Sequence, residues 1–350
     1  MPVRLAEQDA DSPCGQVLES AQFINEHSQD VTVPLAGVQQ AATKILQHMQ
    51  QAEYSPATWK THALNPQTAD AYAVEWIFLI DLLNFSFWTA PNTPAHTVTV
   101  DGTCYSGYWA LPAAVRRARN EGVDLADAHV YSTLSAAQWA HAMRSDDPHA
   151  HLPLLTERLA VLHAAGRVLC ERYAGKFGNL LAQCASAEQL VVRVVGEFAS
   201  FRDTHVFCGR EVAVYKRAQI LAADLWACFE GRGVGAFADI GRLTMFADYR
   251  VPQALCYFGA LEYSARLVRH LRAAQEQDGV EGELPSGHVW EVEIRGNSVW
   301  AVECMRKHIR KTTGQDVSAV LIDFFMWDYA KAHAEEMREI PIHHTRSVYY

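Results

Sequence analysis

The sequence predicts a mainly α-helical protein that carries a small antiparallel β-hairpin. Apolar residues recur at helical spacing through most of the 350 residues, and one short segment alternates β-branched residues around a tight turn signal. The composition, 49% hydrophobic and 20% charged, is typical of a soluble globular protein. Because a chain of this length can bury a substantial core, we expect a single domain over 1–350, with a possible sub-domain boundary in the polar stretch near 143–151.

Ten segments show the periodicity of helices. Ser186 precedes one of them as a cap, the pair Asn65-Pro66 is expected to open another, and Pro252 suits a first helical position. The predicted helices are 14–27, 36–50, 67–88, 109–120, 153–174, 186–199, 213–229, 252–274, 288–311 and 317–338.

The β-hairpin is predicted near 97–106, in the segment HTVTVDGTCYSG. Asp101-Gly102 is a strong signal for a two-residue turn between strands. A second short extended stretch is expected in THVFCGREV. The glycines of 231–241 superficially resemble a dinucleotide-binding loop, but no strand precedes them, so a tight turn between two helices is the better interpretation.

Charge and cysteine content exclude several classes of protein. The net charge is -10, with 40 acidic against 30 basic residues, which argues against a surface that tracks long nucleic acid but allows a small anionic ligand. The eight cysteines are scattered without a CxxC pair, so we expect no structural zinc and reduced thiols in the cytoplasm. No secretory signal opens the sequence, and the most apolar window, 73–88, is too short and too acidic to cross a membrane.

Two aspartates, Asp323 and Asp328, lie inside the apolar stretch VSAVLIDFFMWDYA. A carboxylate held in an apolar environment needs a partner, and such groups gather at functional sites. On one helix the two lie about 140° apart, so they share a ligand only if the pocket wraps around the helix or the backbone breaks. Alternatively, each aspartate is a buried hydrogen-bond anchor.

A second acidic segment, LTMFADYRVP, places Asp248 and the Phe246 ring close to a helix start, because Val251 before Pro252 is held extended. Ligand contacts are common at such junctions. The alternative is that Asp248 only caps the helix.

Several basic and histidine residues have two interpretations. Lys216 is a candidate for a phosphate site, although basic residues at helix starts are usually solvated or paired. Glu291 and Arg295 are expected to pair along one helix face. His62 before a helix is more often structural than catalytic. The terminal segment HHTRSVYY either covers a pocket or docks on the surface.

Several blocks of the sequence together resemble the queuosine salvage family of queuosine 5′-phosphate N-glycosylases. They are FRDTH, YKRAQILAADLW, LTMFADYRVPQAL, EVEIRGNSVWAVE, VLIDFFMWDYA and HHTRSVYY. The resemblance implies a fold related to helix-hairpin-helix DNA glycosylases. It also implies that Asp328 matches the acid that acts as nucleophile or transition-state stabiliser, and that the residues matching queuine contacts are His62, Phe246, Asp248, Asp323 and Phe324.

The activity that this resemblance implies is release of queuine from queuosine 5′-monophosphate for reuse in tRNA modification. We therefore expect a small-molecule substrate, no stable binding of nucleic acid, no membrane association, and no metal or organic cofactor. The alternatives are a base glycosylase acting on nucleic acid, a non-catalytic protein that binds queuine or its nucleotide, and a helical adaptor. Serine-hydrolase, zincin and P-loop motifs do not occur in the sequence.

Overall fold

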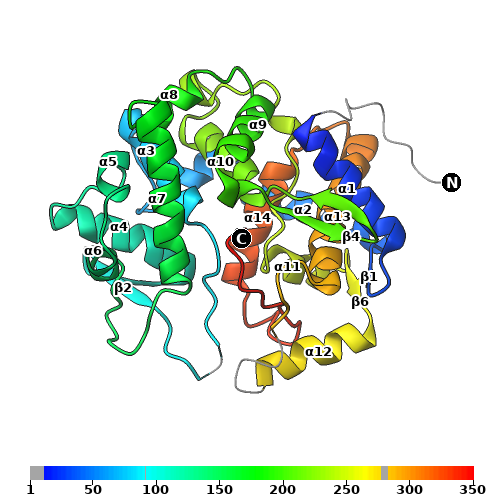
Figure 1. Cartoon of the computed structure of the whole chain (residues 1–350). Coiled ribbons are helices and arrows are strands. Elements are labelled where there is room, and N and C mark those ends of the chain that lie inside the picture. The colour runs from blue at the N-terminus through cyan, green and yellow to red at the C-terminus, as the bar shows by residue number, and fades with distance from the viewer. Residues whose placement is uncertain (1–11, 91, 277–282) are drawn as a thin grey trace.

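The computed structural model describes residues 12–90, 92–276 and 283–350 and is mainly helical, as predicted (Figure 1). Helices α3 to α8 gather on one side of the view, α1, α2 and α13 on the other, and α14 lies between them. The helices are α1 (Pro13–His27), α2 (Leu35–Gln51), α3 (Ala71–Leu82), α4 (Ala110–Asn120), α5 (Ala128–Tyr131), α6 (Ala136–Ala142), α7 (Leu155–Arg172), α8 (Phe177–Leu181), α9 (Ala187–Glu197), α10 (Lys216–Cys228), α11 (Val251–Tyr257), α12 (Ala265–Glu276), α13 (Val289–Thr313) and α14 (Ala319–Ala332).

The described strands form three antiparallel pairs. The predicted hairpin joins β2 (Thr97–Val100) to β3 (Thr103–Ser106), and both turn residues have the positive φ that this turn requires, 51° at Asp101 and 80° at Gly102. The second predicted stretch is also a hairpin, formed by β4 (Thr204–Phe207) and β5 (Arg210–Ala213). The pair β1 (Val31–Thr32) and β6 (Glu262–Tyr263) was not predicted, because two residues give no alternating pattern.

The predicted helices are confirmed in position, but three were too long. The 67–88 segment is helical only over α3, since Asp70 rather than Asn65 caps it, by accepting from the Ala73 N–H at 2.9 Å. The 252–274 segment contains two helices, which Gly259 at φ 77° and β6 separate. The 317–338 segment ends its helix at Ala332. The short helices α5, α6 and α8 were missed, because one or two turns carry little periodicity.

Two connections that the sequence singled out have now been located. The glycine-rich 231–241 segment lies in the connection between α10 and α11, which contains the 3₁₀ turns η4 (Gly233–Gly235) and η5 (Ile240–Arg242). This connection runs from Phe229 to Arg250, so the prediction of a tight turn between two helices was wrong. The polar 143–151 stretch connects α6 to α7, and its Asp146 N–H donates to the Thr97 carbonyl of β2 at 2.8 Å. One large cluster of buried apolar residues extends from Cys14 in α1 to Met337 beyond α14, and a small second cluster contains Ile24, Phe207, Val212 and Val292.

The C-terminal segment packs into the body beside the residues that follow α3. The Ser86 N–H donates to the Tyr350 carbonyl at 2.8 Å, and the Trp88 indole N–H donates to the Thr345 carbonyl at 3.1 Å. Arg346 stacks over the Trp88 ring, with its guanidinium carbon 3.5 Å from the ring centroid. These contacts support docking of the tail, and Tyr350 also reaches the cavity described below.

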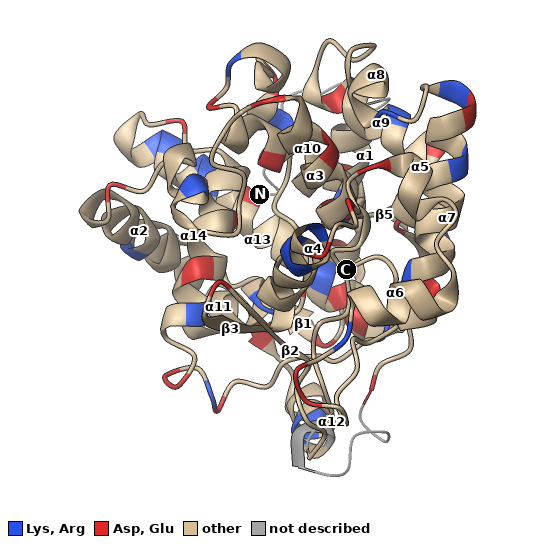
Figure 2. Cartoon of the chain, turned by 90° about the vertical axis from the view of Figure 1, so that its left-hand side faces the viewer, with Lys and Arg blue, Asp and Glu red and all other residues tan. Residues whose placement is uncertain are grey.

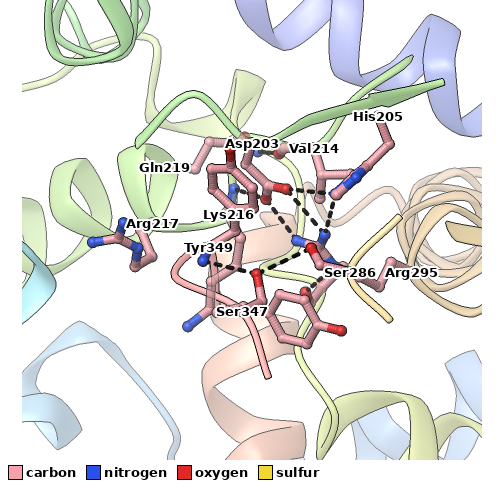
Figure 3. Close-up of polar contacts among 12 residues, drawn as sticks. Asp203, His205, Val214, Lys216, Arg217, Gln219, Ser286, Arg295, Ser347 and Tyr349 are labelled. Carbon is pink, nitrogen blue, oxygen red and sulfur yellow. Dashed lines mark hydrogen bonds and ion pairs between the residues drawn. The ribbon is translucent and has the colours of Figure 1, made fainter. Parts of the chain in front are cut away.

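A buried ion-pair network holds the start of α10 against α13 (Figure 3). The Arg295 guanidinium donates to both oxygens of Asp203, at 3.0 and 2.6 Å, and pairs with Glu291 at 3.3 Å as the helical spacing predicts. The Lys216 N–H donates to the same Asp203 carboxylate at 3.2 Å. Asp203 therefore positions the first residue of α10, whose side chain enters the cavity.

No helix among residues 12–90, 92–276 and 283–350 combines the length and the apolar character needed to span a membrane.

Candidate active site

One cavity of about 680 Å³ brings together all six residues that the sequence marked as site residues. Its walls are formed by α10, α14, the segment before α11 and two 3₁₀ turns, η1 (Pro56–Thr61) and η2 (Gly107–Trp109). The marked residues that line it are His62, Phe246, Asp248, Asp323, Phe324 and Asp328.

Helix α14 supplies the longest wall. Phe324, Trp327, Asp328 and Lys331 all line the cavity, and their spacing of three, one and three residues places them along one face. Asp323 lines it too, although it lies about 140° around the helix from Asp328. Because α14 continues without a break from Ala319 to Ala332, the cavity wraps around the helix, which was the first of the two possibilities.

Asp328 accepts a hydrogen bond from the Tyr54 hydroxyl, at 2.6 Å between the two oxygens. Asp328 lines the cavity and remains solvent-exposed. Partial desolvation by the surrounding residues raises its pKa above the ordinary value, while the Tyr54 hydrogen bond and the charge of Lys331 oppose that rise. Burial and the adjacent Asp328 carboxylate raise the pKa of Tyr54, so the phenol remains a donor. No pattern in the sequence marked Tyr54, which lies just beyond α2 and far from Asp328 along the chain.

Asp323 is fully enclosed and serves two purposes. Its Oδ1 accepts from the Phe246 N–H at 2.9 Å, so it anchors the segment that carries the Phe246 ring, and it also lines the cavity. Burial and the negative charge of Asp248 raise the pKa of Asp323 well above its ordinary value. The anchoring alternative is therefore correct, but it does not remove the carboxyl group from the cavity.

Asp248 likewise combines the two interpretations offered for it. Its Oδ1 accepts from the N–H groups of Arg250 and Val251, at 2.8 and 2.9 Å, at the start of α11. The residue also lines the cavity. Burial raises the pKa of Asp248, and the nearby Lys216 ammonium opposes this rise.

The aromatic rings form apolar walls around these acids. The centroids of Phe246 and Phe324 are 6.0 Å apart, with the ring planes inclined at 53°. This spacing leaves no room for a base between the two rings, so a flat ligand can stack on one and meet the edge of the other.

His62 and Trp109 both line the cavity and stack directly on each other, with ring centroids 3.3 Å apart and planes inclined at 9°. The His62 Nδ1 accepts from the Leu64 N–H at 3.3 Å, which leaves the proton of a neutral ring on Nε2. Burial and the positive charge of Lys331 lower the pKa of His62, which favours the neutral ring.

Helix α10 contributes Lys216, Ile220 and Asp224, each one turn beyond the last. Lys216 is buried, and burial lowers its pKa although Asp248, Asp81 and Asp323 oppose that change. Around it, carboxyl groups outnumber ammonium groups. Asp81 and Asp224 were not marked from the sequence, although each also lies within an apolar helix. A search for every acidic residue within an apolar helix would have found both.

Two further basic residues, Arg217 and His205, do not line the cavity. Arg217 is buried but donates to the carbonyls of Asp81 and Leu82, at 3.1 and 2.5 Å, and does not line the cavity. His205 lies 3.3 Å from the Asp203 carboxylate in the network of Figure 3. Within the described part of the chain, no three His, Cys, Asp or Glu residues are grouped so as to hold a metal ion.

Comparisons with a protein-family model and with individual relatives identify the same family. The sequence model of the queuosine salvage protein family matches residues 64–350. A relative from Bos taurus, named queuosine 5′-phosphate N-glycosylase/hydrolase, is 43% identical over 343 residues, which cover 95% of this chain and 98% of the relative. Relatives of the same name from Schizosaccharomyces pombe and Sphaerobacter thermophilus are 37% and 35% identical, over 96% and 95% of this chain and 99% and 97% of their own length. The chain therefore belongs to the queuosine salvage protein family.

Proposed function

We propose that this protein is an N-glycosidase that hydrolyses queuosine 5′-monophosphate and releases the base queuine. The observation that carries the proposal is the position of Asp328, a carboxylate oriented by Tyr54 within a ring-lined cavity of about 680 Å³. The curated relatives that match this chain almost end to end are named for the same activity.

In the proposed reaction, the bond between C1′ of the ribose and the base nitrogen breaks, and its electron pair leaves with the base. Positive charge builds at C1′, and the Asp328 carboxylate stabilises it. Water then adds at C1′ and loses a proton, so that the products are queuine and ribose 5-phosphate. Because Tyr54 donates to one oxygen of Asp328, the carboxylate is held in place before the charge develops.

The departing base needs a proton or a hydrogen-bond donor, and queuine, a 7-deazaguanine, lacks the ring nitrogen that purine-cleaving enzymes often protonate. Asp323 suits this task, because burial favours its protonated form and, with Oδ1 accepting from the Phe246 N–H, the proton would be carried by Oδ2. The surplus of acids around Lys216 also favours binding of the cationic amine of queuine.

The direct test is to incubate the full chain with queuosine 5′-monophosphate and to follow free queuine by chromatography. The proposal requires many equivalents of queuine per equivalent of protein. A non-catalytic binding protein would instead take up one equivalent and release none, which would overturn the proposal.

A gel-shift assay with duplex DNA at low salt tests the alternative of a nucleic-acid base glycosylase. In Figure 2, basic and acidic residues are interspersed on the face in view, without a continuous basic stripe. Together with the net charge of -10, this supports a small-molecule substrate, and we expect no shifted band.

We also propose a cytoplasmic location, which the eight free cysteines favour.

Replacing Asp248 with asparagine is expected to weaken queuine binding roughly tenfold or more, because a charge-assisted contact with the amine is lost. Asparagine keeps the Oδ1 that accepts from Arg250 and Val251, so the cap on α11 is retained. Calorimetry with queuine measures the effect. Asp70→Asn, which alters the cap of α3 outside the cavity, is the matched control. Unchanged affinity in Asp248→Asn would mean that the residue acts only as a cap.

Replacing Tyr54 with phenylalanine removes the hydrogen bond that favours the ionised form of Asp328. The pKa of Asp328 should rise, and the acidic limb of the pH–rate profile should move upward by about one pH unit. Tyr257→Phe is the matched control, because its hydroxyl donates to Glu336 at 2.6 Å away from the cavity. If Tyr54→Phe lowers the rate but leaves the acidic limb of the pH–rate profile where it is in the wild type, Tyr54 contributes only to packing.

A further inference from the structure

Arg295 is fully buried and does not line the cavity, yet its side chain connects three segments that do. The Nε donates to the carbonyl of Ala247 at 3.0 Å, and the terminal nitrogens donate to the two oxygens of Asp203 at 3.0 and 2.6 Å (Figure 3). The guanidinium carbon also lies 4.0 Å from the centroid of the Tyr350 ring, which is part of the cavity wall. All three guanidinium nitrogens therefore hold protein groups in place.

The Ala247 carbonyl lies between two of the residues marked as base contacts, Phe246 and Asp248. Residues 243–248 form neither helix nor strand, so no regular pattern of backbone hydrogen bonds fixes them. The carbonyl belongs to the planar peptide unit that joins Ala247 to Asp248, so a bond to it restricts the direction in which the Asp248 side chain leaves the backbone. The Phe246 N–H donates to Asp323 Oδ1 at 2.9 Å. The segment is thus held by two of its peptide groups, one from α13 and one from α14.

The Asp203 contact reaches the cavity through the start of α10. Its carboxylate accepts from the Lys216 N–H at 3.2 Å, and its carbonyl accepts from the Val214 N–H at 3.0 Å. Tyr215, between them, has a left-handed backbone with φ 49°, which is unfavourable for a residue with a bulky side chain. Because Asp203 must keep one orientation to hold this turn, the fork of Arg295 also sets where the Lys216 side chain enters the cavity.

Charge pairing alone does not account for this arrangement. Pairing with Asp203 and Glu291 needs only a positive charge, which a lysine would also supply. The Nε bond to the neutral Ala247 carbonyl adds nothing to that pairing. An ammonium group, a single point of charge, does not reproduce the planar fork together with the separate Nε donor. The bond to Ala247 is therefore the part of the arrangement that bears on the cavity.

We propose that Arg295 is a positioning residue of the active site. It touches no ligand, and it fixes Phe246 and Asp248 through the Ala247 carbonyl, so that the ring and the carboxylate meet the base together. The inference rests on the proposed function for the identity of the ligand, but the hold on the segment can be measured without ligand or turnover.

Hydrogen exchange of the full chain tests this hold directly. Arg295→Lys keeps the buried positive charge but removes the Nε donor, so the amides of 246–251 should exchange about tenfold faster or more than in the wild type. Arg306→Lys is the matched control and should leave this exchange unchanged. The Arg306 Nε donates to the Val317 carbonyl at 3.1 Å and its guanidinium pairs with Glu303, outside the cavity. Wild-type exchange over 246–251 in Arg295→Lys would overturn the proposal.

Binding and turnover show whether the hold matters to the site. Arg295→Lys should bind queuine about tenfold more weakly by calorimetry, and Arg306→Lys should bind it as the wild type does. The KM of Arg295→Lys for queuosine 5′-monophosphate should rise by a similar factor while kcat changes less than about twofold, because Asp328 and Tyr54 are not part of this connection. A merely structural role would reduce the folded fraction, which lowers the apparent kcat and leaves KM unchanged. A lower kcat with wild-type KM and queuine affinity would therefore contradict the positioning role.

The wild-type protein offers a test that does not require a variant to fold. In rising sub-denaturing urea, the amides of 246–251 and those of the first turns of α13 should lose protection together, because one guanidinium joins the two segments. Opening of 246–251 at clearly lower urea than α13 would show that Arg295 does not hold the segment, and would reject the proposal.

These measurements separate the inference from the proposed function. Faster exchange over 246–251 and weaker queuine binding in Arg295→Lys, in a protein whose wild type releases no queuine, would retain the positioning role and reject the hydrolysis. Wild-type exchange, queuine affinity and KM in an Arg295→Lys protein that turns over normally would reject the positioning role and retain the hydrolysis.

Discussion

Replacement of Asp328 by asparagine is expected to reduce queuine release from queuosine 5′-monophosphate by roughly a thousandfold or more. The amide keeps the shape of the side chain and can still accept from Tyr54, but it carries no charge to stabilise the ribosyl cation. The loss should appear in kcat, since the missing interaction forms only as charge develops in the transition state.

The control for this variant must separate chemistry from folding. Asp316→Asn removes an exposed aspartate just before α14 and should retain full activity. The Asp328→Asn protein should unfold at nearly the wild-type temperature and bind queuine with nearly wild-type affinity, because the aromatic walls, Asp248 and Asp323 are intact. Wild-type turnover by Asp328→Asn would exclude the role that we assign to this carboxylate.

Replacement of Asp203 by asparagine is expected to lower the free energy of unfolding by about 3–5 kcal/mol, because it leaves the buried guanidinium of Arg295 without its main counter-charge. Urea denaturation measures this effect. Asp101→Asn is the matched control, since its ion pair with Arg116 at 3.0 Å is solvent-exposed and should contribute at most about 1 kcal/mol. Equal losses in the two variants would contradict the assignment of the network as a major stabilising element.

The same network predicts how stability depends on pH. Burial alone would raise the pKa of Asp203, but the charge of Arg295 and the hydrogen bonds of His205 and Arg295 outweigh it and hold this pKa below its ordinary value. Since the unfolded chain binds the proton more readily, the contribution of Asp203 is complete above about pH 4 and is lost as the pH falls toward the folded pKa. The destabilisation caused by Asp203→Asn should therefore shrink at low pH.

Local sequence was enough to mark the acids and rings of the site. Asp323, Phe324 and Asp328 come from one apolar helix, and Phe246 and Asp248 from one segment before a proline, so each group carries its own pattern. What local sequence could not supply is contact between distant segments. Tyr54 meets Asp328 only because α2 and the residues just after it pack beside α14, and no periodicity links positions so far apart.

The helix boundaries likewise depend both on local sequence and on contacts between distant segments. The 67–88 segment is apolar throughout and reads as one helix, yet the chain leaves the helix after Leu82, where the carbonyls of Leu83 and Phe85 accept from the buried Arg158 guanidinium instead. Tertiary hydrogen bonds replaced the helical ones, which a propensity-based prediction does not detect.

The sequence by itself determined the helical class, the hairpin near 97–106, a second extended stretch and the choice of the six marked residues, because these depend on periodicity, turn chemistry and contiguous blocks. Only the tertiary structure decided that the cavity wraps around α14, that Asp248 and Asp323 anchor backbone while facing the cavity, and that Tyr54 donates to Asp328. The physical reason is that charge pairing, desolvation and cavity shape depend on contacts between segments that are distant in the sequence. The order of residues within one segment does not specify those contacts.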